Sequence, residues 1–285
     1  MSGNLRDPFR TQAEYLAHDA PTKELAAVFE SGGSAGYSDE LRAMIVHELV
    51  LTRHDVANHP LVGRWARGSH WRHHGLGWLP LELTEFERSP GPRGARFEQG
   101  WEALLAGRSV DAAGRTIEFV ETTTDDYTDR AAQAFAHWAK DSNGKIDAHE
   151  YLAADAVRDD DLRDLLVHAA PAFLGTTHTL RAIPATLTQA WLRLYQAGSA
   201  PSYYGSSPGG AHGRLYAWQS IAALTGAPVA ATPDDIARLA RTCRWFALDV
   251  TSAWFWDAWW VSDVALACIG PEPERVAVIA ATGTD

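Results

Sequence analysis

The sequence predicts a mainly α-helical protein, folded as a single-domain helical bundle over residues 1–285 with a minor β-hairpin. Apolar residues recur with helical periodicity along most of the chain, and strong helix-start signals precede several of these stretches. At 285 residues, with 46% hydrophobic and 21% charged residues, the chain is long enough to bury a large core. The composition is that of an ordinary globular protein and disfavours a disordered chain.

The N-terminal third contains the first predicted helices. Two short helices are expected over 11–30. Ser38 is a good N-cap for a longer helix at about 39–57, whose apolar residues lie on several faces, so we expect neighbours to surround it. Residues 58–100 are rich in His, Trp, Gly and Pro and lack a sustained period. They predict an irregular excursion over the core.

The remaining elements begin with a strand. Alternation of apolar and polar residues at 115–122 predicts one strand, or half of a hairpin that turns at 113–114. After it helices are expected, the last with a strong start signal in Thr232 as N-cap and Pro233 as first helical residue. The expected helices span about 126–140, 147–157, 159–170, 176–197, 211–225 and 233–269, the last broken at least once.

Charge and hydropathy restrict the partners. A formal charge of −11 disfavours nucleic acids, whose phosphates need clustered Lys and Arg. The most apolar stretch, 245–260, contains Asp249 and Asp257 and is shorter than the roughly 18–20 apolar residues of a membrane span, so no membrane partner is expected. The N-terminus lacks the apolar region of a secretory signal. We expect a cytoplasmic protein with Cys243 and Cys268 reduced, and the Arg-rich, Lys-poor, Ala-rich composition suggests a bacterial origin.

Hard oxygen ligands are grouped around Gly144 in the segment AFAHWAKDSNGKIDAHEYLAA, residues 134–154. The part from 135 to 151 resembles an EF-hand calcium loop in which the first ligand position is Ala139 instead of the usual Asp. The resemblance implies a weak calcium site, and the alternative is a helix–turn–helix whose polar turn follows ordinary turn chemistry. The oxygen ligands would come from Asp141, Asn143, Lys145, Asp147 and Glu150, with Lys145 at a position where an EF-hand uses its backbone carbonyl.

Histidines are the second signal, with 12 in the chain. One histidine on an apolar helix is usually a hydrogen-bonded core residue, whereas several that converge can hold a transition metal. We therefore consider His47, His178 and His212 as metal-binding candidates. The group at 70–74, which lies among arginines, instead favours a solvated basic loop or an anion contact.

Two segments resemble a known family. LLVHAAPAFLGTTHTLRA, residues 165–182, and GYSDELRAMIVHELV, residues 36–50, are similar to parts of questin-oxidase-like proteins, and only His178 carries over as a ligand. That resemblance implies a non-haem metal ion and an oxygenase. In addition, DDYTD at 125–129 resembles the aspartate-rich motif of terpene cyclases, although capping of a helix start also explains it.

The third signal is a set of tryptophans around two carboxylates. Asp249 and Asp257 lie among indoles between 245 and 260, where an apolar environment would raise a carboxyl pKa and prepare a general acid or base. The alternative is a thick core that these indoles fill. The loop 198–213 is rich in Gly, Ser and Pro and is either a mobile lid or a plain surface connection.

Together these signals lead to a hypothesis of an enzyme that acts on a small hydrophobic or aromatic molecule in bacterial metabolism, specialised metabolism included. It would be oxygenase-like if a metal binds, or else cyclase-like. The alternative is a non-enzymatic ligand-binding or calcium-responsive regulatory protein. Acid–base candidates are Asp249, Asp257, His178 and His212. Substrate-binding candidates are Trp245, Trp256, Trp260, Tyr203, Tyr204 and Arg244.

Overall fold

The centre of the fold is an antiparallel sheet. The computed structural model describes residues 8–30, 38–88, 99–176, 178–202, 205–255 and 262–283. Within these ranges the sheet has six strands in the order β1-β2-β6-β5-β4-β3. The strands are β1 (Phe119–Glu121), β2 (Lys145–Ala153), β3 (His178–Ala185), β4 (Arg244–Ser252), β5 (Ser262–Ile269) and β6 (Arg275–Gly283). The predicted mainly α, all-helical bundle with a minor hairpin is therefore wrong, and the chain has an α/β fold.

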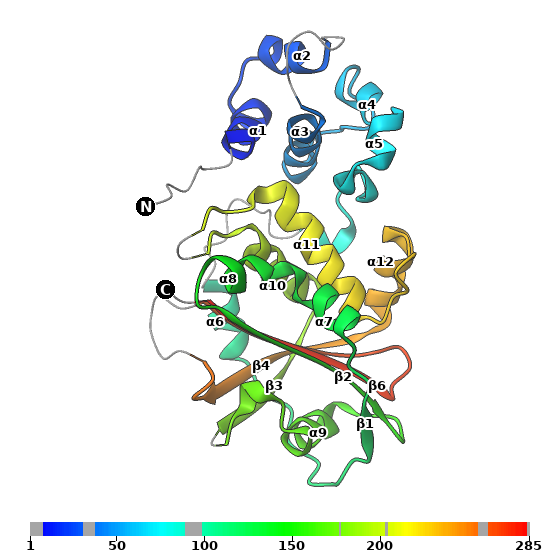
Figure 1. Ribbon diagram of the computed structural model, residues 1–285. Coiled ribbons are helices and arrows are strands. Elements are labelled where there is room, and N and C mark those ends of the chain that lie inside the picture. The colour runs from blue at the N-terminus through cyan, green and yellow to red at the C-terminus, as the bar shows by residue number, and fades with distance from the viewer. Residues whose placement is uncertain are drawn as a thin grey trace.

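Helices cover both faces of the sheet. Figure 1 shows α1 to α5 as an upper lobe, α7, α8, α10, α11 and α12 between that lobe and the sheet, and α9 on the opposite face. The helices are α1 (Pro8–His18), α2 (Thr22–Glu30), α3 (Asp39–Leu51), α4 (Val62–Trp65), α5 (Ser69–His73), α6 (Gln99–Leu105), α7 (Asp125–Ala131), α8 (Ala136–Asp141), α9 (Leu162–Ala169), α10 (Leu187–Ser199), α11 (Gly209–Leu224) and α12 (Pro233–Thr242). Short 3₁₀ helices are η1 (Gly75–Trp78), η2 (Glu85–Glu87), η3 (Ala132–Ala134), η4 (Asp159–Asp161) and η5 (Ala172–Leu174).

The strands lie between two hydrophobic cores. In β6, Ala277 and Ile279 face the core under the helical layer, whereas Val276 and Val278 face the core against α9. Because both faces are buried, such a strand is a continuous apolar run, and its sequence resembles that of a buried helix. This explains why the second part of the helix predicted at 233–269 is instead the strands β4 and β5. The helices predicted at 147–157 and over the first part of 176–197 are also wrong: they are β2 and β3, which contain polar residues and are set as strands by their pairing with β6 and β4.

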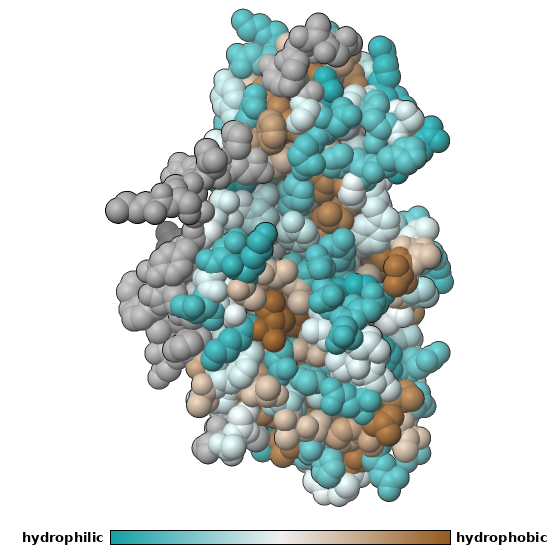
Figure 2. Space-filling model, in the orientation of Figure 1, coloured by the Kyte–Doolittle hydropathy of each residue, from teal (hydrophilic) through white to brown (hydrophobic). Residues whose placement is uncertain are grey.

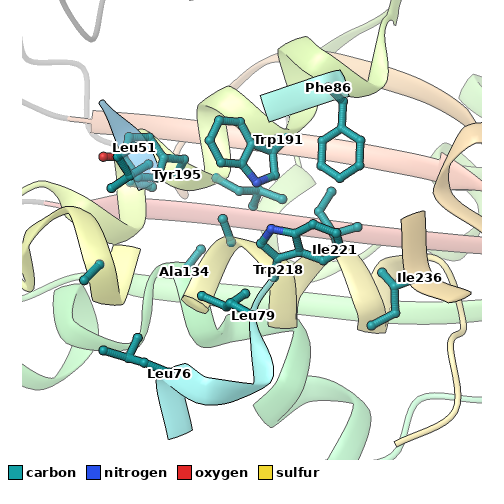
Figure 3. Close-up of a cluster of buried hydrophobic side chains, with 14 of the residues drawn as sticks. Leu51, Leu76, Leu79, Phe86, Ala134, Trp191, Tyr195, Trp218, Ile221 and Ile236 are labelled. Atoms are coloured by element: carbon teal, nitrogen blue, oxygen red, sulfur yellow. The ribbon is translucent and has the colours of Figure 1, made fainter. Parts of the chain in front are cut away.

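Three aromatic side chains form the middle of the larger core (Figure 3). The ring of Phe86 lies 5.3 Å from that of Trp218 and 6.4 Å from that of Trp191, measured between centroids. The two tryptophans belong to α11 and α10, and Phe86 comes from the segment between the upper lobe and the sheet. The core therefore joins the helical layer to that connecting segment.

The two clearest predicted helix starts are confirmed. Ser38 caps α3 by accepting a hydrogen bond from the backbone N–H of Leu41 at 3.1 Å. Thr232 caps α12 by accepting from the backbone N–H of Asp235, whose carboxylate accepts in return from the N–H of Thr232, and Pro233 lies in the first turn. Within the described ranges, no helix has both the length and the apolar character that crossing a bilayer requires. The face drawn in Figure 2 is mostly hydrophilic, with apolar residues in small separate patches.

Candidate functional site

A polar cavity of about 180 Å³ lies where α1, α3 and the end of α10 meet the start of α11. Most of its lining side chains can donate, accept or exchange a proton. The described lining residues are Glu14, His18, Glu48, Leu51, Thr52, Tyr195, Ser199, Ser207, Gly209 and Gly210. One wall is part of the 198–213 loop that the sequence suggested as a lid.

Glu48 is the buried carboxylate of this cavity, with 5% of its surface exposed. Its Oε1 atom accepts a hydrogen bond from the backbone N–H of Ala211, in the first turn of α11, at 3.1 Å. The first turn of a helix has unpaired N–H groups and the positive end of the helix dipole, both of which stabilise an anion. The backbone therefore fixes one carboxylate oxygen of Glu48 and leaves the other toward α1.

His18, the last residue of α1, meets that other oxygen. Its Nε2 atom lies 3.3 Å from Oε2 of Glu48, and both side chains are almost fully buried, with exposures of 5% and 6%. An ionised carboxylate can only accept, so the proton of this hydrogen bond lies on Nε2. In the neutral imidazole the other nitrogen, Nδ1, then keeps a lone pair that can accept a proton.

Tyr195 adds a hydrogen-bond donor. Burial raises the pKa of its phenol strongly, and the negative charge of Glu48 raises it further. The phenol is therefore protonated at neutral pH. The neighbouring loop is fixed by Arg10, which donates to the backbone carbonyl of Ser207 at 3.1 Å, and by the hydroxyl of Ser207, which accepts from the N–H of Gly209 at 3.0 Å.

His47 has a structural role. Its Nδ1 accepts from Arg214 at 2.9 Å, and its Nε2 donates to the carbonyl of Leu76 at 2.8 Å. Burial, and then the charge of Arg214, lower its pKa well below the usual range. Both ring nitrogens are engaged, so neither is available to the metal ion that the sequence suggested.

Arg214 holds this region together. Its guanidinium pairs with Glu87 through Nε at 2.7 Å and through the NH2 group at 3.0 Å, and both side chains are fully buried. Its remaining N–H groups reach His47 and the carbonyls of Pro80 and Glu82. All five donors are satisfied, and the segment before Glu87 is fastened to α3 and α11.

His212 lies beside a carboxylate of α3. Nε2 of His212 lies 3.2 Å from Oε1 of Glu40, whose Oε2 atom lies 2.9 Å from Nε2 of His74. The structure describes only the backbone of His178, which is paired with Ser252 between β3 and β4. Among the described residues, no group of three or more His, Cys, Asp or Glu side chains has a geometry that could hold a metal ion.

The described part of the tryptophan-rich segment is strand β4 followed by a turn at 253–255. Asp249, in β4, accepts from Arg181 of β3 at 2.9 Å and is partly exposed. Trp245 is buried, and its indole N–H donates to the carbonyl of Ala240 at 3.0 Å, while Arg244 pairs with Asp159. These side chains therefore do not form one aromatic pocket. Trp256, Asp257, Trp260, Tyr203 and Tyr204 lie outside the described residues.

The EF-hand-like ligands are also dispersed. Asp141 ends α8, Asn143 follows in the turn, and Lys145 begins β2. Asp147 and Glu150 lie on opposite faces of that strand, where Asp147 meets His149 at 2.8 Å and Glu150 accepts from Arg275 at 2.7 Å. The segment is a turn and a strand, so these side chains do not surround one point.

The sequence did not predict the polar cavity. Its central residues, His18, Glu48 and Tyr195, come from three helices, and their meeting depends on how those helices pack. The available signals were a glutamate within the otherwise apolar run around 48, and paired glycines at 209–210 that allow close approach of another chain segment.

One family model matches nearly the whole chain. It is described as a family of unknown function (DUF6183), and the match covers residues 3–285. No curated protein and no solved structure matches the chain.

Proposed function

We propose that this chain, which belongs to the family of unknown function DUF6183, is an enzyme that transfers a proton to or from a small polar molecule in the cavity between α1, α3 and the start of α11. The contact of His18 with the anchored carboxylate of Glu48 carries this proposal. A histidine whose ring is oriented by a carboxylate is a common general base, since the carboxylate fixes the tautomer and stabilises the charged ring. His18 is the proton acceptor, and Glu48 orients it.

The lining limits the substrate. The cavity, at about 180 Å³, is smaller than the roughly 300–1,000 Å³ of sites for drug-sized ligands, which favours a molecule of few heavy atoms. Glu14 and Glu48 make the walls negative, so a neutral or cationic substrate is favoured over an anion. The hydroxyls of Ser199 and Tyr195, which contact each other, add polar oxygens to the wall. For this cavity a small amine or polyol fits better than the aromatic molecule that the sequence suggested.

Burial of the two groups supports catalysis. The side chains of His18 and Glu48 are almost fully buried, and the loop before α11 is fastened to α1 by the hydrogen bond from Arg10 to the carbonyl of Ser207. Electrostatic interactions are stronger where water is excluded. A charge that develops on His18 during proton transfer is therefore stabilised by Glu48 more than it would be at an open surface.

Deuterium exchange tests the proposal across a range of candidate substrates at once. The purified protein is incubated in D₂O with a mixture of amino acids, amino alcohols, hydroxy acids and sugars of up to about six carbons. We expect mass spectrometry to find enzyme-dependent deuterium on carbon in at least one compound. His18→Asn should abolish the exchange and Glu48→Gln should reduce it at least tenfold. His73→Asn, an exposed site, is the matched control.

The outcome also separates two classes of protein. A compound that raises the melting temperature of the protein but acquires no deuterium would identify a ligand-binding protein, and the catalytic proposal would be wrong. Exchange that survives His18→Asn would place the base elsewhere.

A further inference from the structure

A second pocket, of about 340 Å³, is lined by the C-terminal half of α11, by α12 and by the 3₁₀ turn that ends at Trp78, and its described lining shares no residue with the cavity of Glu48. Trp78, Val229 and Ile236 give it apolar walls. Arg130, Gln133 and Gln219 give it polar groups on one side. Its volume lies in the range of small-molecule sites, and an apolar lining with a few polar groups is typical of them.

Gln219 provides the most specific feature of this pocket. Its Oε1 atom is buried and has no hydrogen-bond partner among the described residues. A buried acceptor without a donor costs about 1–3 kcal/mol, and proteins satisfy most such atoms. Gln219 lines the pocket, and rotation of its terminal amide would turn this shielded oxygen toward a ligand, whose N–H group would supply the missing donor.

Arg130 supplies donors close by. The hydroxyl of Ser220, next to Gln219, donates to the carbonyl of Ala131, next to Arg130, at 2.8 Å, so the two elements are held in register. Among the described residues, the guanidinium of Arg130 donates to the carbonyl of Ala227 at 3.3 Å and pairs loosely with the exposed Asp126 at 3.8 Å. A guanidinium has five N–H donors, so others remain for a ligand.

Trp78 provides a flat apolar wall. Its ring lies edge-to-face with that of Trp218, with centroids 6.4 Å apart at 87°, which fixes its orientation. Aromatic ligands gain from stacking on such a ring, and Ile236 is a buried aliphatic neighbour in the same lining. A planar ligand is therefore favoured over a branched aliphatic one.

We propose that this pocket binds a planar bicyclic lactam, with its ring against Trp78, its ring N–H donated to Oε1 of Gln219 and its carbonyl accepting from Arg130. A lactam presents a donor beside an acceptor on one edge, which complements the Gln–Arg pair. Purine bases with an oxo group and quinolone-type compounds share this edge. The site is separate from the cavity of His18, so it does not depend on the proposed enzymatic function.

Isothermal titration calorimetry on the full chain tests this site. The probes are hypoxanthine and 2-quinolone, one for each source of the lactam edge, and N-methyl-2-quinolone, which lacks the N–H. We expect at least one lactam to bind, and for 2-quinolone we expect N-methylation to weaken binding at least tenfold because Gln219 then stays unpaired. Binding of hypoxanthine alone would indicate a purine base, and binding of 2-quinolone alone the other class.

Gln219→Leu is the decisive variant. It should lower the affinity of the lactam that binds at least tenfold, whereas Gln12→Leu on α1, outside the pocket, should leave it unchanged. The Leu variant should fold, because it removes an unsatisfied buried acceptor, and its melting temperature checks this. Failure of both lactams to bind the wild-type chain at 1 mM, or equal affinity of wild type and a folded Gln219→Leu variant, would overturn the proposal.

Discussion

Gly210 lies so close to Glu48 that a Cβ atom on it would be 2.8 Å from Oε1 of that carboxylate. The same Cβ would lie 2.8 Å from Cδ1 of Leu51. Separations under about 3 Å between such atoms are not tolerated without movement. Because residue 210 is a glycine, the carboxylate of Glu48 can reach the backbone N–H of Ala211 and hold its position opposite His18.

Gly210→Ala should destabilise the fold by about 1–3 kcal/mol, the usual cost of overpacking, and should displace Glu48 from the first turn of α11. Gly75→Ala is the matched control, because a Cβ there meets no atom within 4 Å and the backbone φ is not positive. It should be neutral or slightly stabilising. Urea unfolding of the two variants measures the difference, and equal midpoints would contradict the close contact.

Arg214→Met should destabilise the protein by about 3–5 kcal/mol, because the carboxylate of Glu87 would stay buried without its cation. Arg238→Met removes an exposed ion pair with Asp235 and should change stability by less than about 1 kcal/mol. Chemical denaturation of both variants tests the contrast. A loss of under about 1 kcal/mol for Arg214→Met would mean that Glu87 is neutral or hydrated.

His149 should make the protein less stable at alkaline pH. Hydrogen bonds, first with Asp147 and then with Glu121, raise its pKa to about 9 from an unfolded value of about 6.5. The stabilisation is complete below pH 6.5 and is lost as pH rises through 9. With allowance for solvent screening we expect about 1–2 kcal/mol. The difference in unfolding free energy between wild type and His149→Gln should shrink from pH 6 to pH 10, and a constant difference would refute the ion pairs.

His47 should make the protein less stable at acidic pH. Burial, and then the charge of Arg214, lower its pKa in the folded state, so below about pH 6.5 the unfolded chain binds a proton that the folded chain does not. Stability is therefore lost as pH falls from 6.5. In His47→Asn the amide oxygen can replace Nδ1 as acceptor but does not titrate. Its unfolding free energy should be lower at pH 7 yet fall less between pH 6.5 and 5, and equal slopes would contradict a neutral His47.

Helix starts could be predicted because their signals are local. Thr232 and Ser38 each satisfy backbone N–H groups within three residues, so the sequence alone contains both donor and acceptor. Strand β5 could not be distinguished from a helix, because Val264 to Ile269 are apolar at every position and buried, and β6 shows the same pattern at Val276 to Ala281. Only the pairing of β6 with β2 and β5 decides their conformation.

The sequence by itself determined where helices such as α3 and α12 begin and that a loop rich in glycine and serine precedes α11. The tertiary structure decided that the chain is built on a sheet, and it decided which polar groups meet. His18, Glu48 and Tyr195 are far apart in sequence and belong to separate helices. Their contact depends on packing between those helices, which no local pattern of residues contains.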